Sequence, residues 1–361
     1  VRIAVFDVGF PTVDVNPAFE HIRDEKRIIA TFNFITNEEN VYESASHGTS
    51  VLSCIAGKTG NQQMGLATEA EFLLARTEYP VKEPFSEEEN WLAAAEWADK
   101  NGAHIINSSL GYTYHRYFVR DMDGKTTFVS RAANTAASKG MLVVNALGNE
   151  GTTRWKYIGA PADADSVLSV GGTDPETGFH TSFSSFGPTA DFRLKPNVCA
   201  LGHVIAAGES ELVKTQGTSF ASPLVAGFAA CAKQKHPGLT CMELFRKIEK
   251  SGDLYPYFDY AHGYGVPQAE YFTNPENLSE KAPTFEFVKD IDFLVVSITD
   301  TISDTANNYL YYHVEKDGFL AKYAVIEVYQ KDAFRFDLNS ETFSEGILRV
   351  VFNGYLAEYE L

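Results

Sequence analysis

Three side chains that could do chemistry stand where the expected backbone structure changes. Asp7 follows a short apolar run that predicts a strand. His47 and Ser219 each stand at the expected start of a helix, close to a glycine. A histidine exchanges protons near neutral pH, and a serine hydroxyl becomes a nucleophile when a neighbouring base takes its proton. Together they predict a nucleophilic site, although each alone also fits a turn, a surface position or a helix cap.

The serine segment is the most specific of the three. It is the string Gly-Thr-Ser-Phe-Ala-Ser-Pro at 217–223. A helix cap requires one residue, whereas this string fixes six, which chance would produce on the order of once in 10⁵ chains. We expect Pro223 in the first turn of the helix, where its missing N–H costs little.

In these segments, and in the chain order Asp7, His47, Ser219, the sequence resembles the subtilases, a family of serine peptidases with that order of Asp, His and Ser. The resemblance covers roughly residues 1–272. Further segments similar to family motifs lie at 107–111, 148–151, 158–162, 182–188, 195–198 and 263–265.

The resemblance implies a role for each site residue. Ser219 would attack the substrate carbonyl, His47 would take and return the proton, and Asp7 would orient the imidazole. The Asn149 side chain and the Ser219 N–H would stabilise the oxyanion. The residues expected to bind the substrate are Ser109, Leu110, Gly111, Gly148 and Gly159.

The pocket for the residue before the scissile bond, position P1, is expected to have apolar walls. Gly159 at its base has no side chain, and Leu110 and Leu147 are apolar. Burying a large apolar side chain is worth about 1.5 to 3 kcal/mol, whereas an exposed ion pair with Glu150 is worth about 0 to 1 kcal/mol. The sequence therefore predicts a large apolar or aromatic residue at P1.

Some positions depart from the family pattern. Val8 stands where Ser or Thr is usual, Phe220 where many members have Met, and Leu224 where His is common. The stretches at 16–19 and 57–65 lack the Asp and the Asn-rich loop of the family's tight calcium site. We expect that site to be lost and no cofactor to be needed, while calcium elsewhere stays open.

Strands and helices must position these residues, and the sequence indicates both. Short apolar runs alternate along it with longer stretches of helical periodicity. This pattern is typical of an α/β fold, and the resemblance implies a subtilisin-like three-layer sandwich around a mainly parallel sheet. The predicted strands span 2–6, 71–76, 104–108, 141–146, 166–171 and 204–207. The predicted helices span 87–101, 131–139 and 219–234, with a further helical run at 51–56.

After about residue 274 the pattern changes to period-two alternation, punctuated by Asp-Gly and Asn-Gly turns. It predicts a catalytic domain at 1–274 and a small β-sandwich-like domain at 282–361. The aromatic residues of this tail alternate as core residues do, which disfavours a carbohydrate-binding or adhesion role. Its partner is not identifiable from the sequence.

The net charge of the chain disfavours some classes of binding partner. The 361 residues contain 30 Lys and Arg against 48 Asp and Glu, a net charge of −18, which disfavours nucleic acid and anionic membranes. No apolar run approaches the roughly 18 residues of a membrane span, and no signal peptide is recognisable at the start. The resemblance implies polypeptide substrates and a secreted, periplasmic or cell-surface location. For Cys231 and Cys241, free buried thiols are favoured over a bridge.

The leading hypothesis is a serine endopeptidase. One alternative is a catalytically silent subtilase-like binding protein, which the intact Asp7, His47, Ser219 and Asn149 argue against. Another is a peptide-processing esterase or macrocyclase on the same fold. It would share every catalytic residue, so only product analysis separates it from a peptidase.

Overall fold

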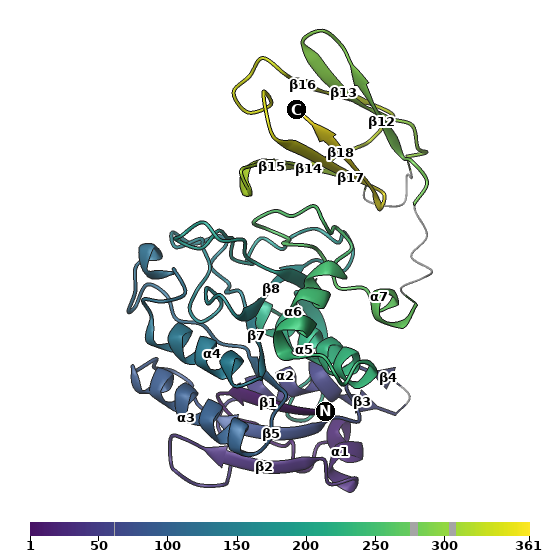
Figure 1. Cartoon of the computed structure of the whole chain (residues 1–361). Coiled ribbons are helices and arrows are strands. Elements are labelled where there is room, and N and C mark those ends of the chain that lie inside the picture. The colour runs from purple at the N-terminus through teal and green to yellow at the C-terminus, as the bar shows by residue number, and fades with distance from the viewer. Residues whose placement is uncertain (61, 275–280, 303–307) are drawn as a thin grey trace.

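The computed structural model describes residues 1–60, 62–274, 281–302 and 308–361. Its larger part is built on a seven-stranded sheet in the order β2-β5-β1-β6-β7-β8-β9, in which every neighbouring pair is parallel (Figure 1). The strands of this sheet are β2 (Ile28–Asn33), β5 (Glu71–Arg76), β1 (Arg2–Asp7), β6 (Ile105–Ser108), β7 (Leu142–Ala146), β8 (Val167–Thr173) and β9 (Val198–Leu201). The predicted α/β class is confirmed.

Helices cover both faces of this sheet, which makes three layers. Helices α2 (His47–Ala56) and α5 (Thr218–Lys235) pack on one face, and α3 (Ser86–Lys100) and α4 (Phe128–Ser138) on the other. The remaining helices are η1 (Pro17–Phe19), α1 (Glu20–Asp24), η2 (Val119–Asp121), α6 (Cys241–Lys250) and α7 (Glu270–Thr273).

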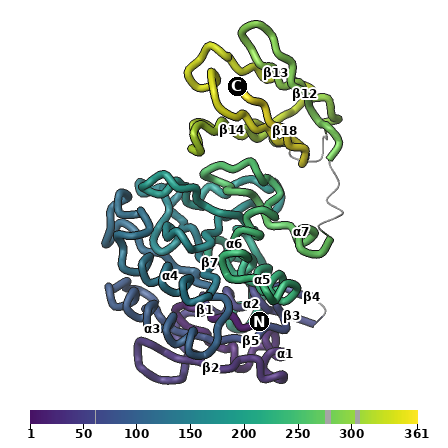
Figure 2. Tube along the Cα trace, viewed as in Figure 1, coloured from purple at the N-terminus to yellow at the C-terminus, as the bar shows by residue number. Residues whose placement is uncertain are grey.

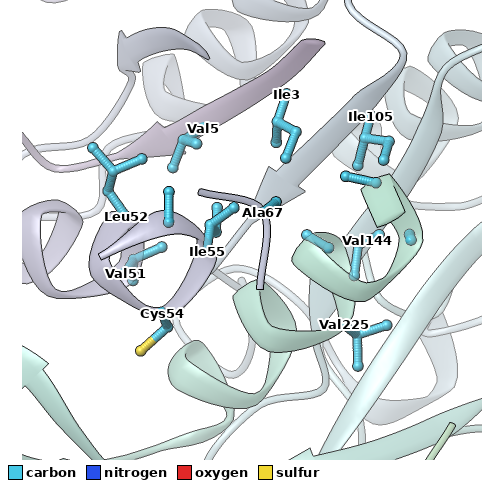
Figure 3. Packing of buried hydrophobic residues seen from close by; sticks show 14 of the residues in the cluster. Ile3, Val5, Val51, Leu52, Cys54, Ile55, Ala67, Ile105, Val144 and Val225 are labelled. Carbon is cyan, nitrogen blue, oxygen red and sulfur yellow. The ribbon is translucent and has the colours of Figure 1, made fainter. Parts of the chain in front are cut away.

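The alternation of side chains along β1 divides the core between the two faces. Ile3 and Val5 pack with Leu52 and Ile55 of α2, as Figure 3 shows. Phe6 points to the opposite face, where its ring meets Trp91 of α3 edge to face at 5.5 Å. The central strand is therefore buried on both faces, which fixes the position of its last residue.

The C-terminal part consists of two antiparallel sheets. They form the light green to yellow part of the trace at the top of Figure 2. Leu294, Val296, Leu310, Val314 and Val350 from the two sheets form one buried cluster. The strands are β12 (Phe285–Lys289), β13 (Phe293–Ile298) and β16 (Ala333–Asp337) in one sheet, and β15 (Phe319–Glu327), β14 (Tyr309–Lys316), β17 (Ile347–Phe352) and β18 (Tyr355–Glu360) in the other. The all-β tail is thus confirmed. Its boundary stays a prediction, because 275–280 lie outside the described residues.

One predicted strand belongs elsewhere. The segment 204–207 lies in β10 (His203–Ala207), which pairs antiparallel with β11 (Leu212–Gln216) outside the main sheet, and β9 takes the sheet edge instead. Ile205 is 47 % exposed, because the face of this ribbon is open. The other small ribbon pairs β3 (Lys58–Thr59) with β4 (Gln62–Gln63).

Two local expectations were also wrong. Pro223 lies inside α5 and not in its first turn, because the helix continues through it from Thr218. Cys231 and Cys241 are free, but Cys231 is exposed and Cys241 half-buried. Helix α6 was not predicted, although the capping box of Thr240 and Glu243 marks its start.

Candidate active site

The carboxyl ends of neighbouring parallel strands lie at the same edge of the sheet. This edge positions three of the site residues. Asp7 is the last residue of β1, Ser109 comes directly after β6, and Asn149 lies three residues beyond β7. His47 is the first residue of α2 and Ser219 the second of α5. The carboxyl edge of an open parallel sheet is where active sites of such folds gather.

Asp7 and His47 form a direct pair. Nδ1 of His47 lies 2.8 Å from Oδ1 and 3.0 Å from Oδ2 of Asp7. The Asp7 side chain is 1 % exposed, and its Oδ1 also accepts a hydrogen bond of 2.8 Å from the backbone N–H of Val8. The carboxylate therefore fixes Nδ1 as the protonated nitrogen of the neutral ring and leaves Nε2 as a base.

The electrostatics of this pair favour a charged imidazole. Burial lowers the pKa of His47, but the charge of Asp7 and its hydrogen bond outweigh burial, so the pKa lies above the usual value of 6.5. The Phe220 ring, 5.6 Å away between centroids, packs against the imidazole and helps to hold its plane.

A glycine lets α2 approach β1 closely enough for this pair to form. A Cβ atom on Gly48 would lie 2.3 Å from the carbonyl oxygen of Gly9 and 2.9 Å from Cβ of Asp7. Any side chain at 48 would thus push the first turn of α2 away from the strand end. The glycine that follows the histidine in the sequence is therefore part of the site's geometry.

Ser219 begins α5 after a turn that only glycine adopts readily, since Gly217 has φ +143°. The Ser219 hydroxyl donates to the carbonyl oxygen of Ser109 at 3.2 Å. Within the described chain no hydrogen bond joins it to His47. Catalytic hydrogen bonds of this kind often shorten when substrate binds.

A second hydrogen bond returns from Ser109 to Ser219. Because Pro223 has no N–H, the Ser219 carbonyl lacks its usual partner in the helix. The Ser109 hydroxyl supplies one, donating to that oxygen at 2.9 Å. Asn107 connects Ser109 to α5 as well, because it donates to the Ser109 hydroxyl at 3.1 Å and accepts from Ser222 at 3.0 Å. The sequence motifs contained Asn107 and Ser222, but this positioning network was not foreseen.

The side chain of Asn149 is oriented by its neighbour. Its Oδ1 accepts from the backbone N–H of Thr218 at 2.9 Å and from the Thr218 hydroxyl at 3.0 Å. Since a backbone N–H can only donate, these contacts fix the amide oxygen and turn Nδ2 away from Thr218. In the part of the chain that the structure describes, Nδ2 makes no hydrogen bond. Thr218 is the orienting residue that sequence reasoning missed.

The expected substrate-binding residues lie together around a cavity of about 180 Å³ beside Ser219. Thr113 contacts its base, because a Cβ on Gly159 would lie 3.0 Å from Thr113 Cγ2. Glu83 and His115 also line it, which sequence reasoning did not anticipate. The predicted substrate-binding residues on its wall are Ser109, Leu110, Gly111, Gly148 and Gly159.

In the segments that correspond to the family's tight calcium site, several oxygens already accept hydrogen bonds. The Asn16 side chain accepts from Ala18 N at 2.9 Å and donates to Gly208 O at 2.8 Å, so its oxygen already has a partner. The carbonyl of Gly57 accepts from the N–H of Met64 and of Gly65. Among the described residues no group of three or more His, Cys, Asp or Glu side chains could hold a metal ion.

An α/β fold whose Asp, His and Ser side chains gather at the carboxyl edge of the sheet defines a site of the serine hydrolase class. The sequence profile of the subtilase family, Peptidase_S8, matches residues 1–265. The chain belongs to this family. None of the described helices is long and apolar enough to cross a membrane.

Relatives agree with this assignment. The thermostable alkaline protease of Halalkalibacterium halodurans is 30% identical over 255 residues, which cover 69% of this chain and 61% of that protein. Subtilisin BL of Lederbergia lenta is 29% identical over 256 residues, 70% of this chain and 82% of that protein. The chain thus spans less than two thirds of the first of these relatives.

Solved structures confirm the fold. Sphericase has a TM-score of 0.61 at 23% identity, covering 74% of this chain and 90% of its own. The prenylagaramide maturation protease PagA has a TM-score of 0.58 at 23% identity, covering 74% and 90%. At these identities the likeness concerns the fold alone.

Proposed function

We propose that this chain is a serine endopeptidase that hydrolyses peptide bonds of unstructured polypeptides through an acyl-enzyme on Ser219. The observation that supports this most is the 2.8 Å pair of His47 and Asp7 at the sheet edge that also positions Ser219. The pair leaves one imidazole nitrogen free as a base, which a serine nucleophile requires.

In the proposed reaction, the Ser219 hydroxyl leaves Ser109 and turns to Nε2 of His47. Its oxygen attacks the substrate carbonyl while its proton passes to His47. The Nδ2 group of Asn149 and the Ser219 N–H donate to the oxyanion that forms. His47 then returns the proton to the leaving amine as the C–N bond breaks. A water molecule, activated in the same way, hydrolyses the ester and frees Ser219.

Substrate positioning follows from the same edge. The backbone of Ser109–Gly111 would pair with the residues before the scissile bond as an added strand. The P1 side chain would enter the cavity of about 180 Å³. Of the two carboxylates that line this cavity, Glu150 already accepts from the Thr153 hydroxyl at 2.6 Å. The proposed preference for a large apolar P1 side chain rests on the walls at Leu110, Ala146 and Gly159.

The test is incubation of the protein with unfolded casein, with and without a serine-directed fluorophosphonate. We expect peptide release that the inhibitor abolishes, and mass spectrometry should find the label on Ser219. A Ser219→Ala variant is the matched control for both readouts. No release with Ser219 unlabelled would favour a silent binding protein.

The products of one linear peptide separate the remaining alternative. Hydrolysis yields linear fragments with a new carboxylate, whereas a macrocyclase transfers the acyl group to the peptide's own amine and yields a cyclic product. We propose hydrolysis, because the relatives of this chain include a thermostable alkaline protease and subtilisin BL. A cyclic main product would overturn this.

We further propose that the protein acts outside the cytoplasm, as a secreted, periplasmic or cell-surface enzyme, without calcium at the family's tight site. The location rests on the family relationship, since the relatives include subtilisins and alkaline proteases. Neither a nucleic acid partner nor membrane insertion is part of the proposal, which the charge of −18 supports.

A further inference from the structure

A second cavity, of about 360 Å³, adjoins the site and shares Glu83 and the segment Ser109–Gly111 with the cavity beside Ser219. His47 and Val8 line it on the catalytic side. Its outer wall comes from the loop between β5 and α3 and from the first turn of α3. This outer wall carries the acidic residues Glu78, Glu83 and Glu87.

One carboxylate in this cavity has no partner. The Oε1 atom of Glu78 is buried and makes no hydrogen bond within the described chain. A buried acceptor left unsatisfied costs free energy, more so when it is charged. Burial, together with the charges of Asp7 and Glu87, raises the pKa of Glu78 well above its usual value.

The neighbouring carboxyl groups lack an ion-pair partner as well. Glu87 is buried, and its Oε1 accepts from the backbone N–H of Tyr79 at 2.8 Å. Burial raises the pKa of Glu87 to about 7. Glu83 is exposed, and in the described part of the chain none of these three carboxylates has a cation within ion-pair distance.

Arg116 lies close to this wall, but its guanidinium already has partners, since it donates to the backbone carbonyls of Glu83 and Pro84. Arg116 pairs with Glu88 at 2.6 Å, and its guanidinium lies 4.5 Å from the centroid of the Tyr112 ring. Among the described residues, the wall of the cavity contains no Lys or Arg, and His47 is already paired with Asp7. The wall of the cavity thus brings together carboxyl groups that have no cation within ion-pair distance in the described chain, and Arg116, whose charge lowers the pKa of Glu87, is itself paired with Glu88.

The position of the cavity identifies the substrate residue that would enter it. Successive side chains of an extended peptide point to opposite sides. A peptide that lies along Ser109–Gly111 with its P1 side chain in the cavity of about 180 Å³ directs the preceding residue, P2, to the other side. Of the two cavities along Ser109–Gly111, the one that His47 borders would then receive the P2 side chain.

We propose that this acidic cavity is a P2 subsite that selects a lysine or arginine side chain, with Glu78 as its main determinant and Glu87 as support. The inference rests on the proposed peptidase function and adds its substrate class. A cationic side chain would give the orphaned Glu78 oxygen a donor and relieve the repulsion between Glu78, Glu87 and Asp7.

The test uses three peptide coumarin amides of the form Ala-Ala-X-Phe, in which X is Lys, norleucine or Glu. Norleucine keeps the apolar stem of lysine without its charge. We expect kcat/KM for Lys to exceed that for norleucine on the order of tenfold or more, and Glu to be the poorest. In the Glu78→Gln/Glu87→Gln double variant, kcat/KM for the Lys peptide should differ from kcat/KM for the norleucine peptide by no more than about threefold.

The control is Glu96→Gln, an exposed position on the same helix as Glu87, which should keep the wild-type ratio. The cleavage rate of the norleucine peptide measures whether the catalytic residues are intact. A misfolded variant is therefore recognised because it no longer cleaves this peptide. Equal wild-type rates for Lys and norleucine would overturn the inference, as would an unchanged ratio in the double variant. If the proposed peptidase function itself were wrong, none of the three peptides would be cleaved. This result is distinguishable from failure of the P2 proposal alone, in which the peptides are cleaved without a preference for Lys.

Discussion

Asp7→Asn tests whether the Asp7 charge is what makes His47 an effective base. The isosteric change keeps an oxygen that can accept from the Val8 N–H, so the fold should survive. The charge centres of a pair joined at 2.8 Å lie roughly 4 Å apart, which at an effective dielectric of about 20 is worth about 4 kcal/mol. At about 1.36 kcal/mol per tenfold, the rate should fall about 10³-fold.

The same variant should also move the pH profile of kcat/KM. In the wild type, activity should rise as His47 loses its proton, with a midpoint above 6.5 because Asp7 outweighs burial. Without the charge, burial acts unopposed and lowers the pKa, so the rising limb should move to lower pH. The assay is hydrolysis of one fluorogenic peptide from pH 5 to 9.

The matched control is Asp24→Asn, an exposed carboxylate on α1, which should leave both the rate and the midpoint unchanged. A loss smaller than tenfold in Asp7→Asn, or a midpoint that stays or rises, would refute the reasoning that assigns Asp7 an electrostatic role.

Three further predictions concern single features of the site. Ser219→Ala should abolish turnover and change the free energy of unfolding by at most about 1 kcal/mol, because only one oxygen near a helix start is lost; thermal unfolding and hydrolysis rates check this. Profiling with a peptide library should show large apolar or aromatic residues at P1, since the cavity of about 180 Å³ exceeds the roughly 150 Å³ that holds a benzene, whereas Asp, Glu or Gly at P1 would count against it. Gly48→Ala should destabilise the fold by about 1 to 3 kcal/mol and lower kcat/KM, because its Cβ would clash with Gly9; an unchanged melting temperature would contradict this.

The parts of this molecule that depend on local pattern were predictable from its sequence. The buried strands β1 and β5 are continuous apolar runs, and their ends placed Asp7 correctly at a sheet edge. The edge strand β2 escaped prediction, because its side chains are mostly half-exposed and its apolar residues are interrupted by Thr31. The antiparallel β10 was assigned to the wrong sheet for a related reason, since pairing partners are a tertiary property.

In the site, too, the residues in local motifs were predictable, whereas those brought together by tertiary packing were not. Motif strings placed His47 and Ser219 at helix starts, as found. The acidic wall of the second cavity was not foreseen, because Glu78 and Glu87 are separated by a loop and meet only after β5 and α3 pack together. An isolated glutamate in a sequence predicts a solvated surface, and only the fold shows that Glu78 has a buried oxygen without a partner.

The proline in α5 makes positions 109 and 223 a thermodynamically coupled pair. Pro223→Ala would add an N–H that competes with the Ser109 hydroxyl for the Ser219 carbonyl. Ser109→Ala alone leaves that carbonyl without a donor, whereas in the double variant the helix supplies one. In a double-mutant cycle the two unfolding free-energy changes should therefore be non-additive, with the second substitution compensating part of the first. A designer who changes either residue must consider the other.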